Sequence, residues 1–278
     1  MKTPLRIALL GCGGMGSGHA LAISGEDQKK PEFLTYDVYS ECQIEISPLA
    51  DKLELAGIYD IDEARMRWVA EKGWHCYGSY EEILNDETVD AVLIATPNHL
   101  HKEQAIRALR AGKHVLCEKS FTIDAKQAKE IFALAQEKHV FVMEAFWTKF
   151  IPLYRQIEEI LESGKLGEIR AVTAQYGYTT ARETRKFDPA LAGGTLLDIG
   201  VYAIGFACMM MGYAFDDVRS ELVMNSAGTD ALDAITLRKG KTIAQLTTAI
   251  GVNMPTFAAL YGTKGHIDIP EFKNPTRA

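Results

Sequence analysis

The sequence predicts an α/β domain built on a doubly wound parallel sheet, followed by an α+β domain with a mostly antiparallel sheet. Three observations support this prediction. Short apolar runs alternate with helical patterns over residues 1–146, a glycine-rich turn directly follows the first run, and over residues 147–278 most strands follow one another without helices between them. A length of 278 residues suits two domains of ordinary size.

The first domain shows the alternation expected of βαβ units. Apolar runs predict strands over 7–10, 53–59, 89–95, 114–117 and 140–146. Apolar positions at helical spacing predict helices over 15–23, 62–72, 99–111 and 123–138. An irregular segment over 24–52, with one strand expected within 33–46, interrupts this order and is interpreted as a solvated excursion or small hairpin at the domain edge.

The second domain shows a different order of elements. A helix over 152–163 precedes strands over 169–178, 218–225, 231–238, 242–250 and 256–261. Turn signals at 239–240 and 262–265 indicate hairpins. An apolar helix over 200–211 is expected to lie on the resulting sheet.

Composition and charge exclude several classes of protein. A net charge of −7 and a pI near 5.6 make nucleic acid or an anionic membrane an unfavourable partner for the whole chain. The five cysteines have no metal-ligand spacing, so no metal site is expected. We expect them to be reduced thiols in the cytoplasm. The apolar stretch over 201–215 is shorter than the roughly 20 residues that cross a bilayer.

A glycine motif follows the first predicted strand and opens the first predicted helix. It fits G-x-G-x-x-G, and its candidate cofactor-binding residues are Gly11, Gly13, Gly14, Met15 and Gly16. Gly11 permits a tight turn, Gly13 lets the backbone approach a pyrophosphate, and Gly16 allows close packing of helix on strand. The motif therefore predicts a dinucleotide site of the Rossmann type. The alternative is a glycine turn that serves only packing.

Asp60 closes the second predicted strand, where such a site expects a carboxylate for the adenosine ribose hydroxyls. The alternative is that Asp60 or Asp62 caps the next helix. A carboxylate at this place repels a 2′-phosphate, and no Arg or Ser immediately follows it. The sequence therefore favours NAD over NADP as the cofactor.

Polar side chains follow two further strands. The group after strand 89–95 comprises Thr96, Pro97, Asn98 and His101, and the group after strand 114–117 comprises Glu118 and Lys119. The carboxyl ends of parallel strands share one sheet edge, so both groups are candidates for cofactor binding. The alternatives are that Asn98 caps a helix and that Glu118 and Lys119 form an ordinary surface pair.

Aromatic residues gather around the start of the second domain and on its first strand: Trp147, Phe150, Tyr176 and Tyr178. The two tyrosines share a strand face by the two-residue period. Trp147 and Tyr176 are candidate walls of a pocket for a sugar or ring. A domain core explains the same residues equally well.

Four segments together resemble the Gfo/Idh/MocA oxidoreductase family. They are GCGGMG (11–16), ATPNHLHKEQAIRALRAGKHVLCEK (95–119), MEAFWTKF (143–150) and AGGTLLDIGVY (192–202). The resemblance runs from about Arg6 to Ile269 except over 24–52, and it is nearest the dihydrodiol dehydrogenase and D-xylose 1-dehydrogenase branch. It implies a Rossmann domain, a second domain whose sheet mediates homo-oligomerisation, and hydride transfer between a nicotinamide and a sugar or diol.

The resemblance also implies roles for individual residues. Lys119 matches the family's catalytic lysine, Glu118 its neighbour at the cofactor ribose, and Tyr202 the acid/base of the dihydrodiol branch. Asp198, four residues earlier and expected on the same helix face, is a further catalytic candidate, the base if Tyr202 is not. A neighbouring ammonium would lower the pKa of the phenol and so let it act as a base. Without the resemblance, Tyr202 would be interpreted as a buried core tyrosine.

Two features depart from the family pattern. Ser120 stands where the family usually has proline after the lysine, and the chain stops at Ala278, which leaves open whether the second domain is complete. The sequence thus predicts a cytoplasmic NAD-dependent dehydrogenase that acts on the CH–OH group of a sugar or cyclic diol. The alternatives are a non-catalytic dinucleotide sensor and an NAD-assisted glycosidase.

Overall fold

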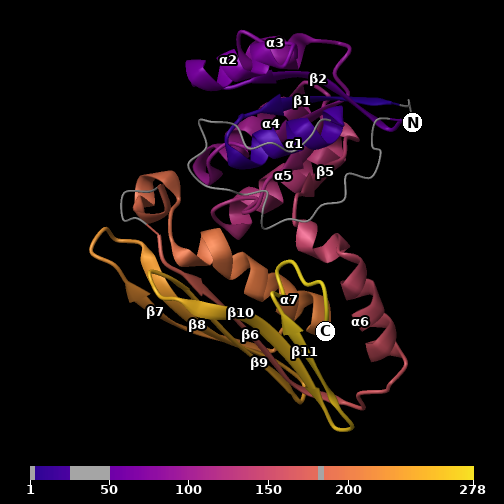
Figure 1. Ribbon diagram of the computed structural model, residues 1–278, viewed down its shortest axis with the longest axis vertical. Coiled ribbons are helices and arrows are strands. Elements are labelled where there is room, and N and C mark those ends of the chain that lie inside the picture. The colour runs from indigo at the N-terminus through magenta and orange to yellow at the C-terminus, as the bar shows by residue number, and fades with distance from the viewer. Residues whose placement is uncertain (1–3, 26–50, 181–184) are drawn as a thin grey trace. The chain divides into compact units, whose positions relative to one another are not determined.

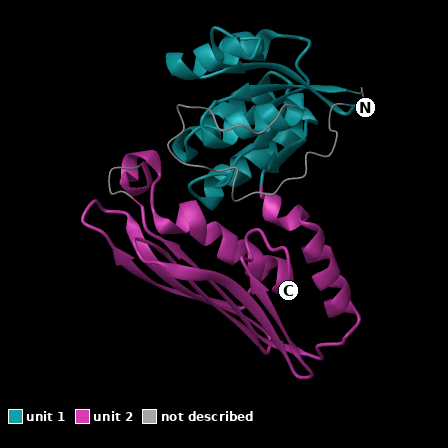
Figure 2. Ribbon diagram, viewed as in Figure 1, with its two compact units in different colours: residues 1–145 teal, residues 146–278 magenta. Residues whose placement is uncertain are grey.

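A computed structural model describes residues 4–25, 51–180 and 185–278. It divides the chain into two compact units, Met1–Ala145 (unit 1) and Phe146–Ala278 (unit 2), which Figure 2 shows in different colours. The irregular segment expected over 24–52 lies almost wholly outside the described residues.

Unit 1 is built on a five-stranded parallel sheet of order β2-β1-β3-β4-β5. The strands are β1 (Leu5–Leu10), β2 (Leu53–Tyr59), β3 (Ala91–Ile94), β4 (His114–Cys117) and β5 (Val142–Glu144). Leu10 and Ile94 belong to one apolar core, whereas Leu9 and Leu93 belong to another. Since successive side chains point to opposite faces, both faces of the sheet are buried, as in a doubly wound fold.

The helices of unit 1 are α1 (Gly14–Ser24), α2 (Glu63–Glu71), α3 (Tyr80–Asn85), α4 (His101–Arg110) and α5 (Ala125–Lys138), with the 3₁₀ turn η1 (Asn98–Leu100) before α4. Aspartate or serine side chains at Asp62, Ser79 and Asp124 accept backbone N–H bonds at the starts of α2, α3 and α5. The sequence did not predict α3, whose six residues are too few to show a helical period.

Unit 2 is built on a six-stranded sheet of order β11-β10-β6-β9-β8-β7. Its strands are β6 (Ile169–Tyr178), β7 (Asp217–Met224), β8 (Asp230–Lys239), β9 (Thr242–Ile250), β10 (Met254–Gly262) and β11 (His266–Pro270). β6 and β9 are parallel and the other neighbours are antiparallel, which confirms the mostly antiparallel sheet. The short β11 follows the predicted turn at 262–265 and was not itself predicted.

Helices cover one face of the unit 2 sheet. There α7 (Val201–Met211) packs on β6 and β9, and its Phe206 is wholly buried against Tyr154 of α6 (Pro152–Glu162) (Figure 1). Among the described residues no helix covers the opposite face. Pro189–Met211 is apolar and long enough to cross a membrane, but 56% of its most apolar 18-residue stretch is buried inside the unit, as in a core helix.

Short non-α turns complete unit 2. They are η2 (Trp147–Phe150), η3 (Arg185–Phe187), η4 (Pro189–Leu191) and η5 (Leu196–Gly200), and η5 is a π-helical turn directly before α7. The sequence predicted one regular helix over 200–211 and did not foresee this π turn.

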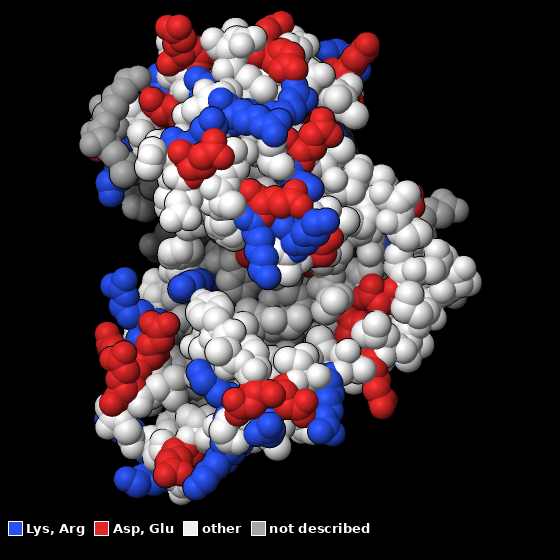
Figure 3. Space-filling model, turned by 180° about the vertical axis from the view of Figure 1, so that it is seen from behind, with Lys and Arg blue, Asp and Glu red and all other residues white. Residues whose placement is uncertain are grey.

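Charged side chains are interspersed on the surface. On the face drawn in Figure 3, acidic and basic groups alternate rather than gather into one patch of a single sign.

Candidate functional site

The carboxyl ends of β1 and β3 meet where the strand order of unit 1 reverses. β2 pairs with one side of β1 and β3 with the other, and ligands of open α/β sheets bind at such a point. Gly11, directly after β1, has a φ of +97°, and a Cβ there would lie 2.8 Å from the carbonyl oxygen of Ala95. The predicted glycine turn and the predicted polar turn after β3 are therefore in direct contact.

The remaining glycines of the motif differ in what surrounds them. A Cβ on Gly16 would lie 2.0 Å from the Gly11 carbonyl oxygen, so this position is closed by backbone. Among the described residues, a Cβ on Gly13 would meet only an Arg65 side-chain nitrogen, at 3.8 Å. Gly13 is the N-cap of α1, and Gly14 and Met15 form the first turn. A helix start with an open approach suits the backbone binding of a phosphate.

Asp60 is buried beside the glycine turn. Its Oδ2 accepts the Cys12 N–H at 2.6 Å and lies 3.1 Å from Nη1 of Arg65, while its Oδ1 accepts the Asp62 N–H at 2.9 Å. The cap of α2 is Asp62, which resolves the two alternatives for helix capping in favour of Asp62. Burial above all, and then the charge of Asp60, raises the pKa of the Cys12 thiol to about 12, so this thiol stays neutral.

Sequence reasoning missed Arg65. It lies in the first turn of α2, five positions after Asp60, and its guanidinium bonds to the carboxylate that was predicted to select NAD. The sequence did offer a signal for this ion pair: an arginine in the first turn of the helix that follows a carboxylate at a strand end.

The turn after β3 is held by its own side chains. Thr96 donates its hydroxyl to Gln104 of α4 at 2.5 Å, and Pro97 leads into η1, whose first residue Asn98 is buried. His101 is 0% exposed, and its two ring nitrogens face the carbonyl oxygens of Thr96 at 2.8 Å and Ser120 at 2.9 Å. His101 therefore joins two turns, and its direct contact with a cofactor stays a prediction.

Glu118 and Lys119 lie on the second of those turns. The Glu118 N–H continues the sheet by donating to Ile94, and its carboxylate Oε1 lies 2.7 Å from Nε2 of His19 on α1. The His19 contact, which the sequence analysis did not foresee, ties the Lys119 turn to the helix that begins in the glycine motif. Lys119 thus lies at the same sheet edge as Gly11–Gly16.

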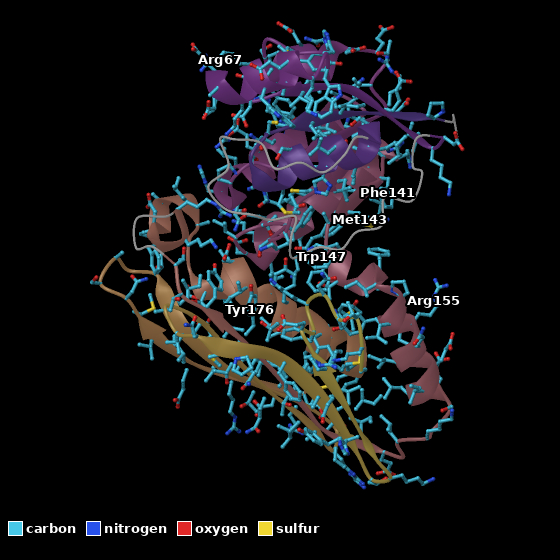
Figure 4. The ribbon with its side chains drawn as sticks, in the orientation of Figure 1. Arg67, Phe141, Met143, Trp147, Arg155 and Tyr176 are labelled. Carbon is cyan, nitrogen blue, oxygen red and sulfur yellow. The ribbon has the colours of Figure 1, made fainter. Side chains whose placement is uncertain are left out.

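The second group of candidates lies in unit 2. Tyr202 of α7 is buried, and its hydroxyl accepts the indole N–H of Trp147 at 3.3 Å. Three aromatic rings surround it, with centroids at 5.9 Å (Phe146), 6.1 Å (Trp147) and 6.4 Å (Tyr176). Figure 4 labels Trp147 and Tyr176. Phe150, by contrast, is 65% exposed.

Asp198 lies on the π turn η5, directly before the helix that carries Tyr202. Its Oδ2 accepts the hydroxyl of Tyr178 at 2.7 Å and lies 3.3 Å from the ammonium of Lys186, while Arg185 lies 3.8 Å from Oδ1. Lys186 also donates to the Tyr178 hydroxyl. Sequence reasoning missed both cations.

Tyr176 and Tyr178 lie side by side on one face of β6, with ring centroids 5.8 Å apart, as the two-residue period predicted. Each has its own ammonium partner. Lys273 donates to the Tyr176 hydroxyl at 3.1 Å, as Lys186 does to Tyr178. Among the described residues, no cluster of three His, Cys, Asp or Glu side chains could hold a metal ion.

Comparison with known families gives two matches. Residues 5–146 match the oxidoreductase family with an NAD-binding Rossmann fold, GFO/IDH/MocA, and residues 154–268 match the C-terminal domain of the same family. Together these matches cover both units.

Among curated proteins, the chain is similar to the trans-1,2-dihydrobenzene-1,2-diol dehydrogenases of Xenopus tropicalis and Homo sapiens. Each is 35% identical, over 196 and 195 residues respectively. These alignments cover 70% and 69% of this chain but 59% and 58% of the relatives, so the chain spans about three-fifths of their length.

Among solved structures, the chain is similar to KijD10, a 3-ketoreductase from Actinomadura kijaniata solved in complex with NADP and TDP-benzene. The TM-score is 0.81 at 28% identity, over 98% of this chain and 78% of that one. An NAD-binding protein from Listeria innocua gives a TM-score of 0.80 at 28% identity, over 97% and 74% of the two chains.

Proposed function

Because the chain belongs to the Gfo/Idh/MocA oxidoreductase family, with its NAD-binding Rossmann fold, we propose that it is a nicotinamide-dependent dehydrogenase of a sugar or cyclic diol. The cofactor would accept or donate the hydride at the CH–OH carbon. The 2.7 Å contact between His19 and Glu118 carries the proposal, because it fixes the Lys119 turn beside the glycine motif.

The residues present fit a dinucleotide. Gly13 leaves open the approach to the start of α1, where backbone amides suit a pyrophosphate, and Gly11 has the left-handed backbone of the tight turn. Glu118 would bind a cofactor ribose. Thr96 and Asn98, on the turn in contact with Gly11, would line the same edge.

The proton would be handled by Lys119 and Tyr202. Oxidation of an alcohol requires a base near the oxygen, and a phenol serves best when an ammonium stabilises its ionised form. Trp147 and Tyr176 pack around Tyr202 and would form an apolar wall for a ring or sugar face. The dihydrodiol dehydrogenases support this choice, since their substrate by name is a cyclic diol.

The cofactor is proposed to be NAD rather than NADP. The carboxylate of Asp60 repels a 2′-phosphate, and Arg65, which would attract one, is engaged by that carboxylate. Titration of both cofactors tests the assignment: NAD should bind more tightly, and Asp60→Ser should narrow the difference. Equal affinities in the wild type would remove Asp60 as the selecting residue.

A turnover assay tests the activity itself. A panel of aldoses, inositols and cyclic diols should produce the absorbance of reduced nicotinamide with at least one compound. A glycosidase would release sugar without net reduction of NAD, and a sensor would bind NAD and do neither. Either result would replace the proposed dehydrogenase.

A homo-oligomer formed through the unit 2 sheet is also proposed. The sheet face opposite α7 exposes the apolar side chains Val223, Ile243 and Tyr261. Ile243 and Tyr261 lie in one row across β9, β6 and β10, and exposed apolar side chains on an uncovered sheet face are typical of interfaces. Ile243→Glu should reduce the molecular mass measured by light scattering, and a monomeric wild type would contradict the proposal.

A further inference from the structure

Glu144 has no role in the proposed function so far, although it belongs to the MEAFW segment of the family pattern. It is the last residue of β5 and pairs in register with Cys117, the last residue of β4. The Ala145 N–H donates to the Cys117 carbonyl at 2.7 Å, which fixes the end of β5 against β4. Glu144 therefore leaves the sheet beside the turn that carries Lys119.

The side chain of Glu144 reaches across that turn. Its Oε1 accepts the N–H of Phe121 at 2.9 Å. His101 bonds to the preceding carbonyl, that of Ser120, at 2.9 Å. Two side chains from two other elements thus hold the residues directly after Lys119.

The charged groups near Glu144 belong to the turn that is proposed to bind the cofactor. Burial above all, and then the charge of Glu118, raises the pKa of Glu144, whereas the charge of Lys119 lowers it. The Cys117 thiol stays neutral because burial raises its pKa. Other titratable groups at the turn, among the described residues, include His19, on the carboxylate of Glu118, and His101, whose pKa burial lowers.

We propose that Glu144 is a positioning residue for Lys119: its carboxylate, bonded to the Phe121 N–H, clamps the turn and, once ionised, favours the ammonium form of Lys119. This inference rests on the proposed function, in which that ammonium stabilises the ionised phenol of Tyr202. A carboxylate close to an ammonium favours the charged form of both groups. Without it, Lys119 would lose its proton at lower pH, and the phenol would lose its cation.

Glu144→Gln separates the two contributions, because glutamine keeps an oxygen that can accept the Phe121 N–H but carries no charge. The pH dependence of Lys119 modification by trinitrobenzenesulfonate, followed by mass spectrometry, reports the ionisation of this lysine without any turnover. The midpoint should fall by about one pH unit in Glu144→Gln. The pH limit of kcat on the alkaline side should fall with it.

Glu130→Gln is the matched control. Glu130 is also a carboxylate of unit 1 that pairs with a lysine, Lys102 at 2.6 Å, but the pair lies on α4 and α5. This variant should leave the Lys119 midpoint and kcat unchanged. An unchanged midpoint in Glu144→Gln, or an equal shift in both variants, would overturn the proposal.

The labelling result also separates this inference from the proposed function. If the wild type turns over no substrate, the dehydrogenase proposal fails, yet a lowered Lys119 midpoint in Glu144→Gln would still establish the charge coupling. If the wild type is active and the midpoint does not move, Glu144 has only a structural role and the inference alone fails.

Discussion

The two units present their candidate residues in different ways. In unit 1 they lie on turns directly after β1, β2, β3 and β4. The main chain of the glycine turn packs closely there, as at Gly11 against Ala95, and side chains such as Thr96 and Glu118 tie the later turns to helices. In unit 2 they lie on α7, η5 and β6, and side-chain bonds set their places, as between Tyr178 and Asp198. Unit 1 should therefore be sensitive to an added Cβ, whereas unit 2 should be sensitive to the loss of a hydroxyl or a charge.

The sheets differ in the same sense. Apolar cores cover both faces of the unit 1 sheet, whereas helices cover one face of the unit 2 sheet. Strands buried on both faces give continuous apolar runs, which are easily recognised in a sequence. In strands with one solvated face, apolar and polar residues alternate, so the place of a functional side chain depends more on what the polar residues contact.

The largest expected effect tests the main-chain control of unit 1. Gly16→Ala would place a Cβ 2.0 Å from the backbone oxygen of Gly11, where neither atom can yield without moving the turn. The free energy of unfolding should fall by about 3 kcal/mol or more. Chemical denaturation measures this loss, and cofactor binding should be lost with it.

Gly13→Ala is the matched control, because within the described part of the chain its Cβ would meet only Arg65, at 3.8 Å. Stability should change by less than about 1 kcal/mol, since an open site imposes little strain. NAD affinity should nevertheless fall by at least about tenfold if the pyrophosphate approaches this backbone. Unchanged affinity in a folded Gly13→Ala variant would argue against the glycine motif as the phosphate site.

The next prediction tests the proposed roles of Lys119 and Tyr202. Lys119→Ala and Tyr202→Phe should each lower kcat by about 10²–10⁴-fold, the range typical of acid–base groups, while NAD still binds. The double variant should be little worse than either single variant, because groups that act in one proton transfer are not additive. Independent, multiplicative losses in single and double variants would show that the two residues act separately.

Much of this architecture was predictable because it depends on local pattern. The apolar runs predicted the bounds of β2, β4, β6 and β9 correctly, and the spacing of glycines predicted the turn before α1. The features that the sequence did not predict are either very short elements or depend on contacts between distant residues. Six residues were too few to reveal α3, and no local signal distinguishes the π turn η5 from a regular helix.

The candidate sites show the same division. The sequence brought Lys119 and Tyr202 to attention by resemblance, but it could not show that His19 would bond to Glu118, 99 positions away. Lys186 was missed for a related reason, since its partners Tyr178 and Asp198 lie on β6 and η5. Contacts of this kind appear only when separate elements have folded together.

A third prediction concerns a buried carboxyl of unit 2, that of Asp233. Asp233 of β8 is 0% exposed, and its Oδ1 has no hydrogen-bond donor within the described ranges. Burial above all, then the charge of Asp230 and a bond to it, raises the pKa of Asp233 from its ordinary 3.8 to about 7. The folded protein therefore binds this proton more tightly than the unfolded chain does.

The sign of the effect follows from that raised pKa. The contribution of Asp233 to stability is complete below pH 4 and is lost as the pH rises to 7, because the folded state then has to hold a buried charge. Asp233→Asn should abolish this slope and raise the free energy of unfolding at pH 8 by about 2 kcal/mol. Urea unfolding at several pH values measures it, and parallel curves for both proteins would contradict the assignment.

The smallest expected effect tests whether side-chain bonds set the unit 2 site. Tyr178→Phe removes the hydroxyl that donates to Asp198 at 2.7 Å, but Lys186 stays 3.3 Å from that carboxylate and keeps it paired. A single lost hydrogen bond of this kind is worth about 1 kcal/mol, so kcat should fall by about fivefold. Tyr176→Phe is the matched comparison: it lies on the same strand face and also loses a lysine bond, that to Lys273.

The two tyrosine variants should divide between the kinetic constants. Because Tyr178 acts on Asp198, its loss should lower kcat with little change in KM, whereas Tyr176, in the wall around Tyr202, should mainly raise KM. If both variants alter only KM, then Asp198 takes no part in the chemical step, and its bonds to Tyr178 and Lys186 serve to hold η5 on the sheet. If Tyr178→Phe alone lowers kcat, the orientation of Asp198 is part of catalysis. The side-chain bonds that hold the candidate residues of unit 2 then also determine the rate of the chemical step.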